Sequence, residues 1–176
     1  MRLGKMLIAV MVSGLLVAGG ASTGVAGNLF EKEVEKEAGA VKLAREVLKG
    51  GYSLVTVHEL KNWRDAGKDM VVVDTMPYES SYKKAHVPGA RQFLFPIPDM
   101  DKWDPAETAG KSRAEYEALL GPDKDRLIVL YCGFVKCTRS HNGAVWAARL
   151  GYKNVYRFAG GIYAWKGAGY PAGKVD

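Results

Sequence analysis

A cysteine at the end of an apolar segment is the clearest candidate for chemistry in this sequence. Residues 127–131 form the most apolar strand-like run, Cys132 follows directly, and the loop up to Thr138 leads into a predicted helix. Backbone N–H groups in such a loop stabilise anions and favour the reactive thiolate. The pattern predicts a nucleophile beside an oxyanion cradle, suited to attack on sulfane sulfur, phosphorus or arsenic. The alternative is a buried structural cysteine.

Other side chains of the same loop bear on this chemistry. Lys136 and Arg139 add positive charge, which favours a thiolate. Cys137 is a second thiol and a possible redox partner of Cys132, with simple loop packing as the alternative. Phe134 and Val135 are apolar residues in a loop that is expected to be exposed, where they would add little to the stability of the fold. We therefore interpret them as residues that line the mouth of an apolar pocket or contact a partner. The predicted substrate-binding residues are Gly133, Phe134, Val135, Lys136, Cys137, Thr138 and Arg139.

Strand-like and helix-like segments alternate through most of the chain. We expect strands at residues 53–56, 70–74, 90–94, 127–131 and 153–158. We expect helices at residues 58–66, 80–85, 112–120, 140–150 and 160–165. This alternation predicts an α/β fold in which helices cover both faces of a parallel sheet. Ligands of such sheets bind beyond the carboxyl ends of the strands, which is where Cys132 is expected.

The start of the chain predicts export. Arg2 and Lys5 precede an apolar run over residues 6–18, and small residues follow up to Gly27. This order is typical of a secretory signal peptide, with an uncleaved amphipathic or membrane-anchoring helix as the alternative. We therefore expect a signal peptide at residues 1–27, a periplasmic or secreted protein, and no membrane attachment after cleavage.

The remaining chain divides into a short extension and one domain. Residues 28–51 have helical spacing and end at Gly50-Gly51, which predicts an N-terminal helical extension. This helix either packs on the main domain or binds a protein partner. Residues 52–172 then form the main domain, without an internal repeat.

Composition excludes several classes of function. The 176 residues are 48% hydrophobic and 25% charged, which is typical of an ordinary globular protein. The two cysteines and three histidines show no spacing typical of metal ligands, so no metal site is expected. No glycine-rich nucleotide motif follows the first strand, and no cofactor is expected. The net charge of +6 is spread along the chain, which argues against nucleic-acid binding.

Taken together, motifs along residues 52–172 resemble the rhodanese family. They are Asp74 at the end of a strand, the segment YKKAHVPGA at 82–90, Tyr131-Cys132 with Arg139-Ser140, GYKNV at 151–155, and Gly160-Gly161 with Trp165. The resemblance implies a five-stranded parallel sheet with helices on both faces. It also implies a sulfurtransferase in which Cys132 takes sulfane sulfur from a small anion, such as thiosulfate or polysulfide, and passes it to a thiophilic acceptor. Asp74 and His86 are then mainly structural.

The sequence departs from the family pattern in three places. The loop from Cys132 to Arg139 is about two residues longer than usual, Met76 stands where an arginine is common, and Cys137 lies within the loop. These departures leave the donor open. They also leave two alternatives: a sulfur- or selenium-carrying module that acts with a partner protein, and a phosphatase or arsenate reductase, which the loop length disfavours.

Overall fold

The computed structural model describes residues 23–175. The chain divides into two compact units, Met1–Glu35 and Lys36–Asp176. Helix α1, Thr23–Gly50, belongs to both units, since it runs across the boundary. The predicted signal peptide, residues 1–27, lies outside the described residues except for its last few, which are part of α1. Among the described helices, none combines the length and the apolar character that a membrane crossing needs.

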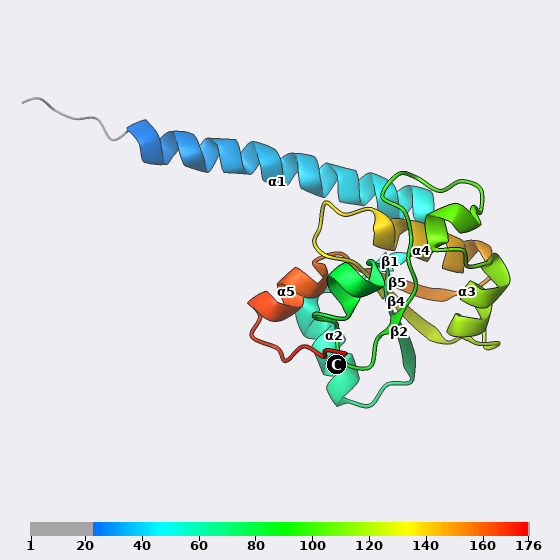
Figure 1. The fold of residues 1–176 in the computed structure, drawn as a ribbon. Coiled ribbons are helices and arrows are strands. Elements are labelled where there is room, and N and C mark those ends of the chain that lie inside the picture. Colours follow the sequence, from blue (N-terminus) through cyan, green and yellow to red (C-terminus); the bar gives the residue numbers. More distant parts are fainter. Residues whose placement is uncertain (1–22, 176) are drawn as a thin grey trace, which may run out of the picture. The chain divides into compact units, whose positions relative to one another are not determined.

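A five-stranded parallel sheet forms the centre of the second unit (Figure 1). Its strand order is β1-β5-β4-β2-β3, so β4 lies in the middle. In register, Tyr131 at the end of β4 is opposite both Asp74 of β2 and Phe158 of β5. The carboxyl ends of three strands therefore meet beside Cys132. The strands are β1 Ser53–Leu54, β2 Met70–Asp74, β3 Arg91–Gln92, β4 Leu127–Tyr131 and β5 Asn154–Phe158.

Four helices follow the strands, and two of them begin with a capping box. Thr56 caps one helix with Glu59, and Ser112 caps another with Glu115, as the Ser-x-x-Glu spacing predicts. A single π-helical turn and a 3₁₀ turn lie in the connections. The helices are α2 Val57–Asp65, α3 Arg113–Leu120, α4 Arg139–Arg149 and α5 Gly161–Gly167, and the turns are η1 Tyr78–Tyr82 and η2 Pro105–Thr108.

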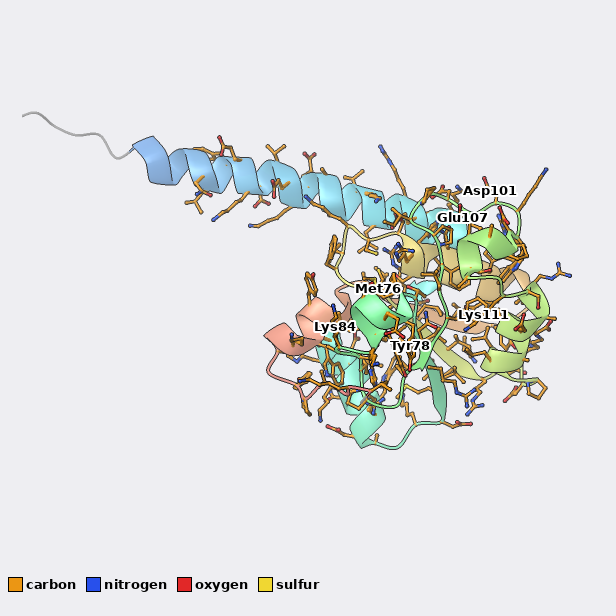
Figure 2. The ribbon with its side chains drawn as sticks, in the orientation of Figure 1. Met76, Tyr78, Lys84, Asp101, Glu107 and Lys111 are labelled. Atoms are coloured by element: carbon orange, nitrogen blue, oxygen red, sulfur yellow. The ribbon has the colours of Figure 1, made fainter. Side chains whose placement is uncertain are left out.

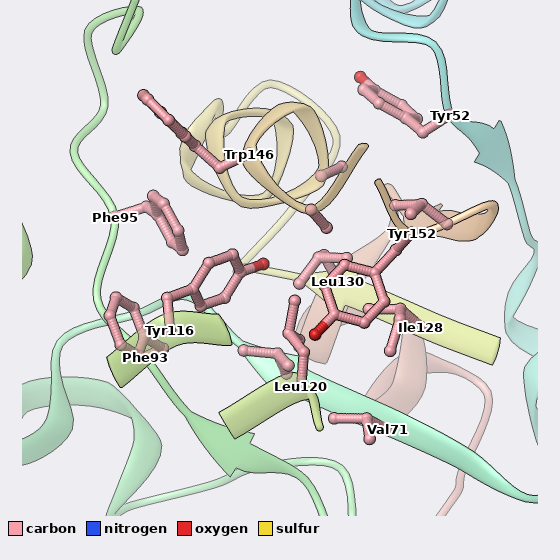
Figure 3. Close-up of a cluster of buried hydrophobic side chains, with 14 of the residues drawn as sticks. Tyr52, Val71, Phe93, Phe95, Tyr116, Leu120, Ile128, Leu130, Trp146 and Tyr152 are labelled. Carbon is pink, nitrogen blue, oxygen red and sulfur yellow. The ribbon is translucent and has the colours of Figure 1, made fainter. Parts of the chain in front are cut away.

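Alternate residues of the central strands fill two separate cores, one on each face of the sheet. Val73 and Leu130 belong to the core shown in Figure 3, together with Tyr116 of α3 and Trp146 of α4. The opposite core combines the intervening strand residues with α2 and α5, through residues that include Val72, Val129, Leu60, Ile162 and Trp165. Because successive strand residues point to opposite faces, a continuous apolar run serves both cores. The expected arrangement, with helices on both faces of a parallel sheet, is confirmed.

Two predicted elements differ from the observed ones. The strand expected at residues 90–94 is only Arg91–Gln92. Two backbone N–H groups after this strand still donate hydrogen bonds to β2 or to the residue that follows it. The N–H of Phe93 donates to the Asp74 carbonyl, and the N–H of Phe95 donates to the Thr75 carbonyl. Pro96 and Pro98 then end the strand-like path, since proline has no N–H to donate. The helix expected at 80–85 is instead the π-helical turn η1.

Candidate active site

The loop between β4 and α4 begins with Cys132 and is held against the start of α5. The N–H of Ile162 donates to the Cys132 carbonyl at 3.0 Å, and the N–H of Tyr163 donates to the Gly133 carbonyl at 3.0 Å. Gly161 has φ +59°, and a Cβ there would stand 2.1 Å from the Cys132 carbonyl oxygen. The Gly160-Gly161 motif therefore lets α5 approach the loop closely, and only glycine fits at the second position.

The Cys132 side chain is fully buried and faces oxygen atoms. Its Sγ lies 3.2 Å from the Cys137 carbonyl oxygen, 3.2 Å from Ser140 Oγ and 3.9 Å from the Phe134 carbonyl oxygen. The two carbonyl oxygens accept hydrogen bonds and favour the protonated thiol, whereas the hydroxyl and N–H of Ser140 lower the pKa of Cys132 and favour its thiolate. Burial raises the pKa of Cys132 well above its usual value, and the interaction with Cys137 raises it further.

The pKa of the Cys137 thiol is shifted in the opposite direction, below its usual value. The Cys132 thiol and the backbone N–H groups of Arg139 and Gly133 stabilise its thiolate, and the charge of Arg139 adds to them. These contacts lower the pKa of Cys137 to about 6, although partial burial opposes the shift. The N–H cradle expected from the sequence stays a prediction.

A buried arginine, Arg157 of β5, ties the loop to the rest of the domain. Its Nε donates to Ser140 Oγ at 2.9 Å, and its NH2 donates to the Cys137 carbonyl at 2.8 Å. Its NH1 donates to the carboxylate of Glu46 on α1 and, at 3.2 Å, to the Tyr52 hydroxyl. The Arg157 side chain is wholly buried, and the carboxylate of Glu46 compensates its charge.

The two residues expected to be structural, Asp74 and His86, form hydrogen bonds with backbone groups outside the loop. Asp74 is buried at the end of β2, where its Oδ1 accepts from the N–H of Met76 at 2.8 Å. Its Oδ2 has no hydrogen-bond partner within the described part of the chain, and burial raises its pKa to about 6. His86 Nδ1 is hydrogen-bonded to the Tyr82 carbonyl at 2.9 Å, and the Val87 N–H donates to the Tyr131 hydroxyl at 2.9 Å.

The other predicted residues of the 132–138 loop are exposed or contact neighbouring segments of the chain. Phe134 and Val135 are exposed, and the ring of Phe134 lies 5.5 Å from that of Tyr163. Lys136 is exposed as well, and its carbonyl accepts from Lys42 Nζ at 3.2 Å. Met76, labelled in Figure 2, approaches within 3.7 Å of the place where a Cβ on Gly133 would stand.

Two further loop residues bind the segment that follows β3. Thr138 Oγ1 donates to the carbonyl of Ile97, and the guanidinium of Arg139 donates to the carbonyl of Phe95. Arg139 is thus already engaged by backbone in this structure, and its predicted role in binding substrate stays a prediction. Within residues 23–175, no cluster of three or more His, Cys, Asp or Glu side chains is placed to hold a metal ion.

Three residues of this site were not identified from the sequence: Arg157, Glu46 and Tyr52. Arg157 carries one weak signal, because it is a charged residue between two aromatic residues, Tyr156 and Phe158, of a strand. The Tyr52 hydroxyl is also hydrogen-bonded to His141 Nδ1 at 2.8 Å, which places His141 inside this network and not in solvent.

Comparison with known proteins identifies the domain. The rhodanese-like domain family matches residues 56–168. The BH2092 protein from Bacillus halodurans is 20% identical with a TM-score of 0.53, over 77% of this chain and 86% of that one. A thiosulfate sulfurtransferase from Pseudomonas aeruginosa is 21% identical with a TM-score of 0.55, over 74% of this chain but only 22% of that one. Curated protein sequences gave no match.

A further similar structure has a different description. A protein of unknown function from Rhodopseudomonas palustris, described as a possible tyrosine phosphatase, is 24% identical with a TM-score of 0.50, over 74% of this chain and 90% of that one. At these identities the solved structures support the fold alone. The family match, however, covers well over half of the chain and includes the whole loop with both cysteines. The chain therefore belongs to the rhodanese-like domain family.

Proposed function

We propose that the protein is a sulfurtransferase that carries sulfane sulfur as a persulfide on a cysteine of the 132–138 loop. The observation that carries the proposal is the pair of thiols in one loop at the carboxyl end of β4, where Cys132 Sγ lies 3.2 Å from Ser140 Oγ and 3.2 Å from the Cys137 carbonyl oxygen. A persulfide is an anion, as a thiolate is, so contacts that favour a thiolate on Cys132, such as those of Ser140, favour the persulfide too. The proposed donor is thiosulfate, polysulfide or a related anion, and the acceptor is a thiophile such as a thiolate or cyanide.

We also propose that the protein works after export, in the periplasm or outside the cell. The charged start, the short apolar run and the small residues up to Gly27 support this proposal. N-terminal sequencing of protein recovered from the exported fraction tests it. A chain that begins near Asn28 is expected, and a chain that retains Met1 would contradict cleavage.

The sulfurtransferase proposal is tested by supplying donors and acceptors to the purified protein. Thiosulfate and inorganic polysulfide are offered as donors, with cyanide as the acceptor, and thiocyanate is measured. The double variant Cys132→Ser/Cys137→Ser is the matched control, because it removes both thiols and changes nothing else. We expect thiocyanate from the wild type alone and no release from a chromogenic phosphate ester. Phosphate release without thiocyanate would favour the phosphatase alternative instead.

A second candidate function is a sulfur or selenium carrier that acts with a partner protein. The exposed apolar side chains beside the loop favour it: Phe134 is 44% exposed, Val135 43% and Tyr163 65%. A pocket of about 630 Å³ also borders the loop, lined by Thr138 and by Lys42 and Arg45 of α1, among others. A carrier is expected to take up one sulfur per molecule from a small donor but to turn over slowly with cyanide. Rapid turnover with small molecules alone would argue for the enzyme.

A further inference from the structure

Arg157 of β5 is the one arginine or lysine side chain with no exposed surface in the described part of the chain. Burial of its charge costs free energy, and an apolar side chain would fill this place in a strand without that cost. The contacts of the guanidinium therefore indicate what it does. It donates hydrogen bonds to four acceptors, which are Ser140 Oγ, the Cys137 carbonyl, the Tyr52 hydroxyl and the Glu46 carboxylate.

The first of these contacts orients the hydroxyl of Ser140. A guanidinium has no acceptor, so Arg157 Nε donates and Ser140 Oγ accepts, at 2.9 Å. The hydroxyl proton then remains for another acceptor, and Cys132 Sγ lies 3.2 Å from the same Oγ. Among the described residues, these are the two partners of Ser140 Oγ. Arg157 thereby directs the Ser140 O–H toward the sulfur, and this donor lowers the pKa of Cys132.

The second contact weakens a repulsion. The Cys137 carbonyl oxygen lies 3.2 Å from Cys132 Sγ, where it accepts the S–H of the neutral thiol. When Cys132 becomes a thiolate, the same oxygen repels its negative charge. Arg157 NH2 donates to this oxygen at 2.8 Å and places positive charge beside it, which weakens the repulsion. Both contacts of Arg157 therefore favour negative charge on the Cys132 sulfur.

Titratable and charged groups from the loop and from four elements surround Cys132 and Arg157. Burial and the neighbouring Cys137 thiol raise the pKa of Cys132, and the contacts of Ser140 oppose this shift. The charge of Arg157 itself is compensated by Glu46 of α1. Arg157 acts on Cys132 by way of the Ser140 contact, which is one of those that lower its pKa. The further groups near the loop are Asp74 of β2, Arg139 and His141 of α4, and Tyr52 before β1.

The side chains that hold Arg157 in place belong to an earlier part of the chain. Glu46 lies on α1, and Tyr52 lies between α1 and β1. Both precede residues 56–168, the part of the chain that matches the rhodanese-like domain family. The carboxyl-terminal part of the extension therefore supports the cysteine loop through Arg157.

We propose that Arg157 is a positioning residue for sulfur transfer, because it favours negative charge on Cys132 through Ser140 and the loop backbone. Glu46 holds the guanidinium in place for this role. The inference rests on the sulfurtransferase function proposed above.

The role applies to both halves of the reaction. With thiosulfate, the Cys132 thiolate attacks the outer sulfur, a new S–S bond forms, the old S–S bond breaks, and sulfite leaves with the electron pair of the broken bond. A thiolate acceptor then attacks the outer sulfur of the persulfide and takes it as its own persulfide, and Cys132 leaves as a thiolate. Arg157 assists both steps, because Cys132 is a thiolate at the start of the first and at the end of the second.

The experiment removes the guanidinium without leaving a lone charge in the interior. Arg157→Met keeps a long side chain, and it is combined with Glu46→Gln so that no buried carboxylate remains unpaired. Arg149→Met is the matched control, since Arg149 is an exposed arginine of α4 that contacts Asp101. Thermal unfolding shows which variants keep the fold at the assay temperature.

Two rates are measured for each variant. Sulfur uptake from thiosulfate and from polysulfide is followed by intact mass. Alkylation of Cys132 by iodoacetamide is followed from pH 6 to 10 by peptide mass spectrometry, in which cleavage after Lys136 separates it from Cys137. Below the pKa of a thiol, the alkylation rate is proportional to its thiolate fraction, so this rate reports on the charge of Cys132.

We expect Cys132 of the double variant to be alkylated at pH 8 at least about tenfold more slowly than in the wild type, because a hydrogen bond to a charged group is lost. Sulfur uptake is expected to slow by a similar factor. Arg149→Met is expected to match the wild type in both rates. In a Ser140→Ala background, the change at Arg157 and Glu46 is expected to slow alkylation less, because Arg157 acts in part through that hydroxyl.

An unchanged alkylation rate in a folded double variant would show that Arg157 only stabilises the fold, and the inference would be wrong. If the double variant does not fold, Arg157→Lys decides, because it keeps the charge opposite Glu46 but lacks the fork of donors that contacts two groups at once. Slower alkylation of Cys132 in Arg157→Lys supports the inference, and the wild-type rate overturns it.

Failure of the proposed function has a different signature. If the wild type gains sulfur from neither donor, the sulfurtransferase proposal fails. The alkylation rates need no donor, so they still decide whether Arg157 favours negative charge on Cys132.

Discussion

The guanidinium of Arg157, near the end of β5, is ion-paired with the carboxylate of Glu46 on α1. The pair joins residues 111 positions apart in the sequence, and the same guanidinium donates to the Cys137 carbonyl of the loop. The carboxyl-terminal part of α1 is therefore part of the domain that carries the site. An uncompensated charge would remain in the interior if either partner were removed.

The first prediction concerns this pair. Glu46→Ala is expected to lower the free energy of unfolding by about 3 kcal/mol, because it leaves the buried charge of Arg157 without its carboxylate. Urea unfolding measures the change. Glu37→Ala is the control, since Glu37 is an exposed residue of the same helix. A loss no larger than that of the control would contradict the structural role of Glu46.

The second prediction concerns the close contact between α5 and the loop. Gly161→Ala is expected to destabilise the protein by about 3 kcal/mol or more, because its Cβ would overlap the Cys132 carbonyl oxygen and because φ is positive. Gly167→Ala is the matched control in the same helix, where a Cβ meets nothing within 4 Å. Thermal unfolding compares the two variants. Equal melting temperatures would show that the loop and α5 are not in close contact.

The third prediction concerns the pH dependence of stability. Burial raises the pKa of Asp74 from its usual 3.8 to about 6 in the folded protein. Between these pH values the folded state binds the proton more tightly than the unfolded state does, so stability falls as the pH rises from about 4 to about 6. Asp74→Asn removes this titration. It is expected to be more stable than the wild type above pH 6, by up to about 3 kcal/mol, and not below pH 4.

Urea unfolding of both proteins at several pH values from 4 to 7.5 tests the third prediction. A constant difference between Asp74→Asn and the wild type across this range would show that Asp74 has a similar pKa in the folded and unfolded states. Burial would then not govern its ionisation.

The fourth prediction concerns oxidation of the thiol pair. Cys132 Sγ lies 3.2 Å from the carbonyl oxygen of Cys137, so the two cysteines are neighbours within one turn of the loop. Mild oxidation is therefore expected to convert the two thiols into a disulfide, with loss of two protons and two electrons to the oxidant. A dithiol reductant is expected to restore both thiols and the activity. Cys137→Ser lacks the second thiol, so any Cys132 that peroxide does oxidise cannot form the disulfide and is expected not to be restored by the reductant once over-oxidised.

Peptide mapping of oxidised wild type tests this linkage directly. A Cys132–Cys137 peptide pair is expected. If no such pair forms, or if Cys137→Ser recovers from peroxide as fully as the wild type does, the protective role of the disulfide is wrong.

The central part of the fold could be predicted because its signals are local. Residues 70–74 and 127–131 are continuous apolar runs, as buried parallel strands require, and both form strands within those bounds. The capping box at Ser112 and Glu115 likewise depends only on neighbouring residues. The position of Cys132 at the end of β4 follows from the same run.

The geometry around the two thiols could not be predicted in the same way. The burial of Arg157 depends on Glu46 and Tyr52, which are more than 100 positions away. The polar groups that surround the Cys132 sulfur depend on the path of residues 133–138. That path is fixed by contacts of Thr138 and Arg139 with the carbonyls of Ile97 and Phe95. No local pattern encodes these long-range contacts.

The most direct test of the central claim is the intact mass of the protein after incubation with a sulfane-sulfur donor and removal of the excess. The account predicts a gain of one sulfur atom, located by peptide mapping in the segment that holds Cys132 and Cys137 and lost on addition of cyanide. An unchanged mass with both thiosulfate and polysulfide, in protein whose cysteines are reduced and alkylatable, would contradict sulfur transfer by this loop.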